Sequence, residues 1–390
     1  MKNITMFLWN NFTNDARVTR EGSALVEAGY QVTVIAKREE NERELEKREQ
    51  LPSGIQVYRK DKAEISVKAL KASTLMKKHI PNALLMFKMI AAGYKIDTDV
   101  YHSHDLNTLI QGVVCAKLRP RKRTLVFDSH EVNTSRTNYS AGLVYKVEKF
   151  LLNFVDHTIV ENETRATYHE RLYGDRPMSL HNYSEYYDIS EVPAAELAIP
   201  ADKKILLYQG GLQQGRGLPL LIDAFKEADV DAVLLMVGDG KIRQQLEEQV
   251  RTLGISDKVI FTGRVPYELL RAYTKRAYIG FQILQNTNFN HYSASSNKLY
   301  EYMMAHVPVI GTNMPEIRRV IEAENIGLVI SESDKNELTA AIRYVMTHPE
   351  KHAEWVLNNE HAKDIYNWEQ EKAKLLNLYK IINVGENNGE

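Results

Sequence analysis

The sequence has a single cysteine, Cys115, among 390 residues, and no membrane-length apolar run. One cysteine excludes an internal disulfide, and a reducing compartment is expected. A helix that spans a bilayer needs about 18 consecutive apolar residues, and no window approaches that length. The opening stretch, 1–15, has too short an apolar run for a signal peptide. The formal net charge of −1 argues against a protein-wide field for nucleic acid. We therefore expect a cytoplasmic protein that does not bind nucleic acid.

The length predicts two domains, because 390 residues exceed one ordinary core. Short β-rich runs alternate with helical spacing, stop in a polar, proline-marked stretch near 184–200, and then resume. This alternation predicts an α/β fold with two doubly wound parallel sheets and helices on both faces. The expected strands are at 4–9, 31–37, 55–59, 99–105, 124–131, 157–162, 204–211, 232–240, 258–265, 278–283, 308–312 and 327–330, with helices at 19–28 and 218–227 and a solvated charge run at 37–50.

The cleft between the two predicted domains is the expected ligand site, because open parallel sheets bind ligands at the carboxyl ends of their strands. The first motif at such an end is YQGGLQQGRG, residues 208–217. Gly210 and Gly211 permit close backbone approach, the following helix start attracts anions, and Arg216 offers a fork that fits phosphate. A plain strand-to-helix turn is the alternative, but Arg216 between two glycines favours phosphate. The loop has neither a Walker A nor a G-x-G-x-x-G pattern.

The second motif is a run of small polar residues directly ahead of a helix, YSASSNKLYEYMM, residues 292–304. Such a run forms a backbone nest for anions, and an acidic residue one turn later can accept hydrogen bonds from a ribose diol. The alternative is an ordinary N-cap serine with a first-turn glutamate. The candidate donor-binding residues of this motif are Ser293, Ser295, Ser296, Asn297, Lys298 and Glu301.

Two further strand ends carry candidate groups. VGDGK, residues 237–241, is interpreted as a structural turn, and Arg264 of FTGRVP follows a strand at the same sheet edge. Arg264 is positioned to meet a diphosphate or a base, and a surface arginine is the alternative.

Histidines and carboxylates end two strands of the first predicted domain, in DVYHSHD (99–105) and TLVFDSHEV (124–132). Histidines at strand ends can donate to sugar hydroxyls or to a developing oxyanion. A metal site is disfavoured, because no H-E-x-x-H pattern and no cysteine ligand accompanies them. The Asp-Thr-Asp triplet at 97–99 precedes a strand and is interpreted as a turn.

Taken together, these motifs resemble GT-B-fold glycosyltransferases, most closely family 4, the retaining, glycogen-synthase-like group. The resemblance covers nearly the whole chain. The family's Y-x-G-R-L-x-x-x-K-G loop corresponds to YQGGLQQGRG, so Gly211 replaces an arginine and Arg216 replaces a lysine. The family's V-G-x-G turn corresponds to VGDG, which adds Gly238 to the donor-binding set. Its E-x7-E motif matches Glu301 at the second glutamate, whereas Ser293 replaces the first.

The resemblance extends to the first domain and to the end of the chain. The family's cleft histidine matches His130, and its preceding strand end matches His104 and Asp105. A loop at 10–22 replaces the family's glycine-rich first loop and places Asp15 and Arg17 on the acceptor side. NWEQ, 367–370, resembles an element before a last helix that crosses back to the first domain. The implied domains are 1–185, completed by a helix at about 368–388, and 200–366.

The implied activity is transfer of a hexosyl or N-acetylhexosaminyl group from a UDP- or GDP-linked sugar to a glycan or lipid-linked acceptor, in cell-surface polysaccharide or glycoconjugate synthesis. The implied route is front-side, with retention, and requires no metal and no protein nucleophile. Arg216 and Lys298 would stabilise the leaving diphosphate, and His130 would act at the sugar end. A sugar-nucleotide epimerase of the same fold and a non-catalytic nucleotide-sugar-binding partner are the alternatives.

The stretch 64–95 mixes lysines with apolar residues and has no acidic residue after Glu64. Such a surface suits anionic lipid headgroups, and an ordinary helix pair with a basic outer face is the alternative. KLRPRKR, 117–123, adds local positive charge. We therefore expect peripheral attachment to the inner face of the cell membrane.

Overall fold

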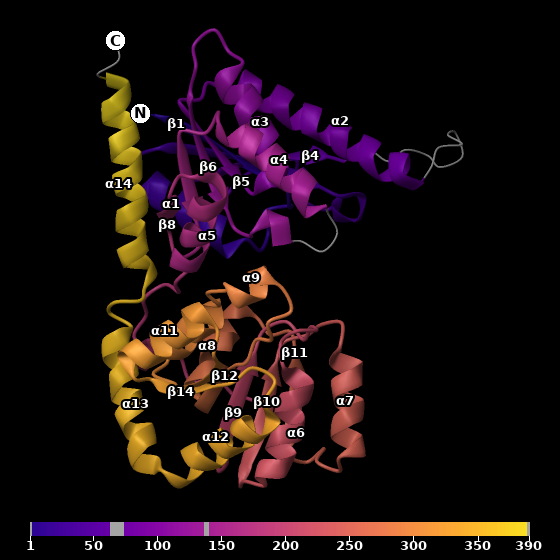
Figure 1. Ribbon diagram of the computed structural model, residues 1–390, viewed down its shortest axis with the longest axis vertical. Coiled ribbons are helices and arrows are strands. Elements are labelled where there is room, and N and C mark those ends of the chain that lie inside the picture. The colour runs from indigo at the N-terminus through magenta and orange to yellow at the C-terminus, as the bar shows by residue number, and fades with distance from the viewer. Residues whose placement is uncertain (1, 63–73, 136–139, 388–390) are drawn as a thin grey trace. The chain divides into compact units, whose positions relative to one another are not determined.

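The computed structural model describes residues 2–62, 74–135 and 140–387. The chain forms two compact units, Met1–Leu180 with Lys372–Glu390, and His181–Glu371. Each unit is built on its own sheet with helices on both faces (Figure 1). The predicted α/β class with two doubly wound sheets is therefore confirmed.

The N-terminal unit has eight strands in the order β3-β4-β2-β1-β5-β6-β7-β8. All neighbours pair in parallel except β3 and β4, which pair antiparallel. The strands are β1 Asn3–Leu8, β2 Gln31–Arg38, β3 Arg48–Gln50, β4 Gln56–Asp61, β5 Val100–His104, β6 Thr124–Ser129, β7 His157–Val160 and β8 Met178–Ser179.

Two of these strands were not expected from the sequence. The solvated charge run at 37–50 contains the end of β2, the 3-10 turn η1 (Glu40–Glu42) and the edge strand β3. An edge strand can carry charged side chains because one side of it stays in water, so its composition does not distinguish it from a loop. The two-residue strand β8 is too short to show a periodicity.

Helices cover both faces of the N-terminal sheet (Figure 1). On one face, Phe7, Tyr101 and Phe127 pack in a single core with Leu85 and Leu109 from two helices. That face is covered by α2 Thr74–Lys95, α3 Leu106–Lys117 and α4 Ala141–Leu152. The remaining helices of the unit are α1 Ala16–Glu27, α5 Glu163–Tyr173 and α14 Trp368–Asn387, and a 3-10 turn η2 spans Asn133–Ser135. Helix α1 starts earlier than the expected residue 19, because Asp15 caps it by accepting from the Val18 amide at 3.1 Å.

The C-terminal helix α14 packs on the opposite face of this sheet. The buried Tyr379 hydroxyl lies 2.9 Å from Nδ1 of His102 on β5, and Asn383 donates to the Tyr30 hydroxyl at 2.6 Å. The last helix thus completes the N-terminal unit, as the sequence predicted.

The C-terminal unit has six strands, all parallel, in the order β11-β10-β9-β12-β13-β14. All six were expected, with ends that differ by at most a few residues. The elements are β9 Lys204–Gln209, α6 Leu218–Ala228, β10 Ala232–Val237, α7 Arg243–Thr252, β11 Val259–Gly263, α8 Tyr267–Lys275, β12 Ala277–Gln282, α9 Phe289–Tyr292, α10 Asn297–Met304, β13 Val309–Thr312, α11 Pro315–Glu324, β14 Gly327–Ile330, α12 Lys335–Thr347 and α13 Pro349–Ala362, after the 3-10 turn η3 Ile189–Glu191.

Each sheet has a point where the strand order reverses. In the N-terminal unit it lies between β1 and β5, and in the C-terminal unit between β9 and β12. Ligands of open parallel sheets bind outside the carboxyl ends of the strands at such points. The sequence after β9 is the glycine-rich loop, and β5 ends in His104.

The docking of α14 predicts a specific loss of stability. Tyr379→Ala should lower the free energy of unfolding by about 3–5 kcal/mol, because it leaves a cavity and an unpartnered His102. Tyr379→Phe keeps the ring and should cost only about 1 kcal/mol. Urea denaturation followed by circular dichroism measures both, and equal losses for the two variants would contradict this packing.

Candidate functional site

The glycine turns after β9 and β10 pack backbone against backbone. Gly210 and Gly238 have φ of +127° and +135°, and the Gly210 amide donates to the Val237 carbonyl at 2.9 Å. A Cβ on Gly238 would lie 2.1 Å from the Gly210 carbonyl oxygen. Both glycines are therefore required for the turns to approach each other, and the backbone after β9 is accessible, since Gly210 is exposed.

A buried lysine lies beneath this loop. Lys298, near the start of α10, places its Nζ 3.3 Å from the Tyr208 hydroxyl and 4.3 Å from the Tyr208 ring centroid. No ion pair of Lys298 occurs within the described part of the chain. Burial, together with the nearby Arg216 charge, lowers the pKa of Lys298 to about 7. The Arg216 Nε is also buried and has no hydrogen-bond partner among the described residues.

The Glu301 carboxylate favours the charged form of Lys298, but burial and Arg216 outweigh it. A buried ammonium is costly, and an anion that binds beside it reduces that cost. The start of α6 at Leu218 and the start of α10 at Asn297 add backbone N–H groups. The arrangement is therefore suited to a diphosphate.

Glu301 is held by a residue that sequence reasoning missed. The Gln209 side-chain amide donates to the Glu301 carboxylate, and Oε1 of the same side chain accepts from the Thr274 hydroxyl at 2.8 Å. Gln209 is the last residue of β9 and is buried. In the sequence, the sign of this role is that a polar residue ends an otherwise apolar strand. The contact fixes the carboxylate one turn into α10.

Two serines of the run before α10 use their hydroxyls internally. Ser293 donates to the Phe289 carbonyl at 2.7 Å, and the Ser295 hydroxyl lies 2.8 Å from the Tyr300 hydroxyl. Ser296 caps α10 without a side-chain hydrogen bond, and Asn297 accepts from Asn182 at 2.8 Å. Ser295 could therefore contact a donor through its backbone amide, and donor binding by this run stays a prediction.

The two remaining donor-side candidates differ in their surroundings. The Gly211 carbonyl accepts from the Tyr208 hydroxyl at 3.1 Å, which ties the loop to its strand. Arg264 is exposed just after β11. Its role in donor binding stays a prediction.

The N-terminal unit holds a buried ionic cluster around Asp128 at the end of β6. Arg17 donates to both Asp128 oxygens, at 2.8 and 2.9 Å, and also to the Leu180 carbonyl at 2.8 Å. Its Nε lies 3.0 Å from Glu21 one turn along α1. Arg17, predicted on the acceptor side, is thus buried and fully engaged within the unit.

Three histidines lie beside this carboxylate, with His102 and His104 stacked and His130 edge-on to His104. His102 and His104 have ring centroids 4.2 Å apart, and His104 Nδ1 lies 3.1 Å from His130 Nε2. His130 Nε2 also lies 3.0 Å from Asp128 Oδ2. The His130 side chain is 20% exposed, whereas His102 and His104 are buried. Of the three histidines, His130 is therefore the one that is accessible to a ligand.

The charges of the cluster set its protonation. Burial disfavours the charged forms, but Arg17 and His130 hold the pKa of Asp128 well below its usual range. The Asp128 carboxylate in turn outweighs burial at His130 and raises its pKa to about 9. Burial and the Asp128 charge raise the pKa of Glu21 to about 8. His130 is thus an imidazolium at neutral pH, suited to donate a proton or a hydrogen bond.

The same cluster has the spacing of a metal site. One ligand atom each from Glu21, His102, His104 and Asp128 lies within 4.8 Å of the others. However, the Arg17 guanidinium already contacts both carboxylates and supplies the positive charge that an ion would bring.

Asp15 and Asp105 lie at the starts of helices, and their side chains accept hydrogen bonds from backbone amides. Asp15 caps α1 and accepts from the Asn10 amide at 2.8 Å. Asp105 precedes α3 with φ +63° and accepts from the His130 backbone amide at 3.1 Å. Asp105 therefore helps to position the His130 loop at the carboxyl end of β6.

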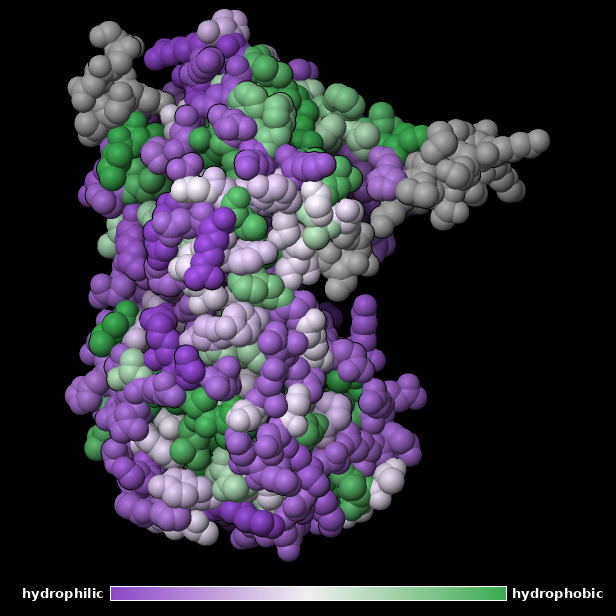
Figure 2. Space-filling model, in the orientation of Figure 1, coloured by the Kyte–Doolittle hydropathy of each residue, from purple (hydrophilic) through white to green (hydrophobic). Residues whose placement is uncertain are grey.

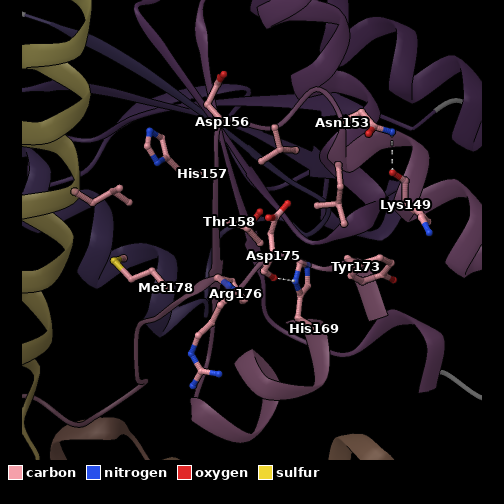
Figure 3. A pocket seen from close by; sticks show the side chains of 14 residues that line it. Lys149, Asn153, Asp156, His157, Thr158, His169, Tyr173, Asp175, Arg176 and Met178 are labelled. Atoms are coloured by element: carbon pink, nitrogen blue, oxygen red, sulfur yellow. Dashed lines mark hydrogen bonds between the residues drawn. The ribbon is translucent and has the colours of Figure 1, made fainter. Parts of the chain in front are cut away.

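A separate cavity of about 520 Å³ lies at the other edge of the N-terminal sheet (Figure 3). It is lined by His157, the first residue of β7, by Met178, the first residue of β8, and by His169, which hydrogen-bonds the Asp175 carbonyl. Because it opens at the amino ends of these strands, it is not the site predicted at their carboxyl ends.

Comparisons with known proteins agree with this geometry. The family model "Glycosyl transferases group 1" matches residues 191–362. The lipopolysaccharide core biosynthesis glycosyltransferase LpsD of Rhizobium meliloti is 30% identical over 170 residues, 43% of this chain and 46% of that protein. An uncharacterized glycosyltransferase of Methanocaldococcus jannaschii is 25% identical over 190 residues, 47% of each chain. The matched region spans about half the length of these relatives.

Solved structures match over nearly the full length. Sucrose-phosphate synthase from Thermosynechococcus elongatus has a TM-score of 0.78 at 19% identity, with 99% of this chain and 100% of that chain covered. Anabaena HepE in complex with UDP has a TM-score of 0.73 at 15% identity, with 97% and 100% covered. These likenesses show the GT-B fold.

The Asp128 cluster gives a prediction for His130. In Asp128→Asn the pKa of His130 should fall from about 9 to below 6.5, because the carboxylate that favours the imidazolium is gone. Stability should fall by roughly 3–5 kcal/mol, since the Arg17 charge stays buried. An NMR pH titration of the ring resonances measures the pKa. Asp156→Asn, at an exposed pair with Lys117, is the control; a His130 pKa that stays near 9 in Asp128→Asn would refute the assignment.

Proposed function

Because the chain carries a group 1 glycosyltransferase domain over residues 191–362 and has the GT-B fold, we propose that it transfers a sugar, with retention, from a nucleotide diphosphate sugar. The donor is UDP- or GDP-linked, and the sugar is a hexose or N-acetylhexosamine. The acceptor is a glycan or a lipid-linked glycan in cell-surface polysaccharide or glycoconjugate synthesis. The observation that carries the proposal is the buried Lys298, which makes no ion pair with any described residue and lies beneath an exposed glycine turn.

Relatives support the choice of donor. Structures of Anabaena HepE hold UDP and UDP-glucose. A relative in Streptomyces fradiae is a 2-deoxystreptamine N-acetyl-D-glucosaminyltransferase, 23% identical over 165 residues. We assign the donor to the C-terminal unit and the acceptor to the N-terminal unit.

In the proposed reaction, the C-terminal unit stabilises the leaving diphosphate. Charge builds on that group as the glycosidic bond to the donor breaks, so cations already in place lower the barrier. Arg216 and Lys298 supply the charge, and the amide of Gly211 approaches the phosphate oxygens. Glu301, oriented by Gln209, accepts hydrogen bonds from the ribose hydroxyls. The route needs no metal, because these groups provide the compensating charge.

His130 is proposed to act on the sugar side. As an imidazolium held by Asp128, it can donate a hydrogen bond to a sugar hydroxyl or to the developing charge. Asp128 acts as a positioning residue, because it binds His130 and Arg17 rather than a ligand.

A membrane surface is the proposed location of the acceptor. Part of the predicted basic stretch, 64–73, lies outside the described residues, and within the described chain no helix has the length and hydropathy to span a bilayer. Leu84 and Phe87 of α2 are exposed, Phe87 by 61%, next to Lys88. Further exposed apolar side chains lie on α3 and α4, and hydrophobic residues gather over these helices (Figure 2). Apolar groups flanked by lysines favour peripheral attachment to anionic lipid.

Glu301 tests the donor assignment. UDP at 100 times its dissociation constant should stabilise the wild type by about 2.7 kcal/mol in thermal unfolding. Glu301→Ala should weaken UDP binding by about tenfold, or about 1.4 kcal/mol, but should not weaken pyrophosphate binding, because pyrophosphate has no ribose. Glu322→Ala, at an exposed position on α11, is the control. Equal UDP affinity in Glu301→Ala and wild type would reject the ribose assignment.

The membrane proposal is tested by co-sedimentation with vesicles. The Leu84→Ser/Phe87→Ser double variant should bind vesicles of phosphatidylcholine and phosphatidylglycerol several-fold more weakly than the wild type, because it removes the exposed apolar contact. Ile365→Ser/Leu357→Ser, at exposed apolar positions of the C-terminal unit, is the matched control. Binding by the wild type that is indifferent to the anionic lipid would count against this surface.

A further inference from the structure

A second positively charged hollow lies in the N-terminal unit, apart from the strand-end residues described above. It has a volume of about 720 Å³ and lies between the edge strands β3 and β4 and the helix α2. It is named here the β4–α2 groove, and its cations are Lys47, Arg48, Arg59, Lys60, Lys88 and Lys95. Of the described residues that line it, Asp61 is the one with a carboxylate.

Two of the six cations are neutralised by carboxylates. Arg59 pairs with Glu49 at 2.7 Å, and Lys47 pairs with Asp61 at 2.8 Å. Asp61 is shared, because Arg38 also contacts it at 2.6 Å. Lys88 donates only to the Asp61 backbone carbonyl. Among the described residues, no ion pair is made by the set Arg48, Lys60, Lys88 and Lys95.

The unpaired cations are held toward one another. Arg48 and Lys60 both lie over the Tyr58 ring, at 5.2 and 5.9 Å from its centroid. Burial, followed by the charges of Arg48 and Lys95, lowers the pKa of Lys60. Repulsion of this kind is relieved by an anion, and a chain with a net charge of −1 has no general excess of cations that would explain the cluster.

We propose that the β4–α2 groove binds a multiply charged phosphate group, as a site separate from the donor site. An arginine fork and several ammonium groups around one hollow match the oxygens and charge of a diphosphate or a phosphomonoester. The groove is three strand spacings from β5 in the sheet order, roughly 14 Å. It therefore anchors a ligand and does not act at the transferred sugar. The source of the phosphate is either a free phosphorylated molecule or a lipid headgroup.

The test follows the NMR signals of individual lysines. Reductive methylation with ¹³C-formaldehyde keeps the charge of each lysine and gives it an NMR signal. Pyrophosphate at low ionic strength should shift the Lys60 and Lys95 signals, and the pKa of Lys60 should rise on binding. Arg48→Gln/Lys60→Gln should weaken the binding seen at Lys95 by about tenfold, which is about 1.4 kcal/mol. Lys335→Gln/Lys351→Gln, with the same loss of charge in the C-terminal unit, should behave as the wild type.

Vesicles with and without phosphatidic acid distinguish the two sources. Loss of vesicle binding in Arg48→Gln/Lys60→Gln identifies a lipid headgroup, whereas unchanged vesicle binding with lost pyrophosphate binding identifies a free phosphorylated ligand. Signals of Lys60 and Lys95 that do not respond to pyrophosphate or to vesicles would overturn the proposal. A response of Lys298 alone would overturn it while supporting the donor site, so the two proposals fail separately.

Discussion

The proposed donor site depends on one physical fact, the burial of the Lys298 ammonium without an ion pair among the described residues. The hydroxyl and ring of Tyr208 are its described contacts, and Arg216 adds a second cation nearby. A fold keeps such a charge only if something offsets its desolvation, and here a bound diphosphate would do so. A Cβ on Gly210 would lie only 3.3 Å from the Lys298 Nζ, so the glycine keeps side-chain atoms away from it, and Gln209 hydrogen-bonds Glu301. The loop, the helix start and the carboxylate thus form one arrangement that is suited to a nucleoside diphosphate.

The N-terminal unit buries a charge of the opposite sign. Asp128 is a buried carboxylate at a strand end, and Arg17 and His130 neutralise it completely. One consequence is that α1, β5 and β6 are tied together by charge as well as by packing. Another is that His130 is held as an imidazolium with one edge exposed. The unit therefore presents a fixed, charged donor, whereas the C-terminal unit presents an incomplete cationic site.

Strand periodicity and glycine placement were sufficient to predict both sheets, the restart of the pattern near residue 204 and the helix that completes the first unit. They failed at β3, whose edge position permits charged residues, and at β8, which is too short. The glycine loop and His130 were found because each follows a strand directly, and Lys298 was found because it follows a run of small polar residues at a helix start. Gln209 and Glu21 were missed, because their roles come from contacts across about 90 to 110 residues of sequence, such as Gln209 with Glu301. The internal hydrogen bonds of Ser293 and Ser295 could not be predicted either, since the presence of a serine in the sequence does not indicate which group its hydroxyl will contact.

The most direct test of the account is the pKa of Lys298 with and without UDP, measured by NMR on ¹³C-labelled lysine and assigned with Lys298→Met. The account predicts a pKa near 7 in the free protein and a rise toward the usual value when UDP binds. By linkage, UDP affinity should then fall as the pH rises through about 7, because the ammonium loses its proton. A pKa that UDP leaves unchanged, or an affinity independent of pH in this range, would contradict the claim that Lys298 holds the donor diphosphate.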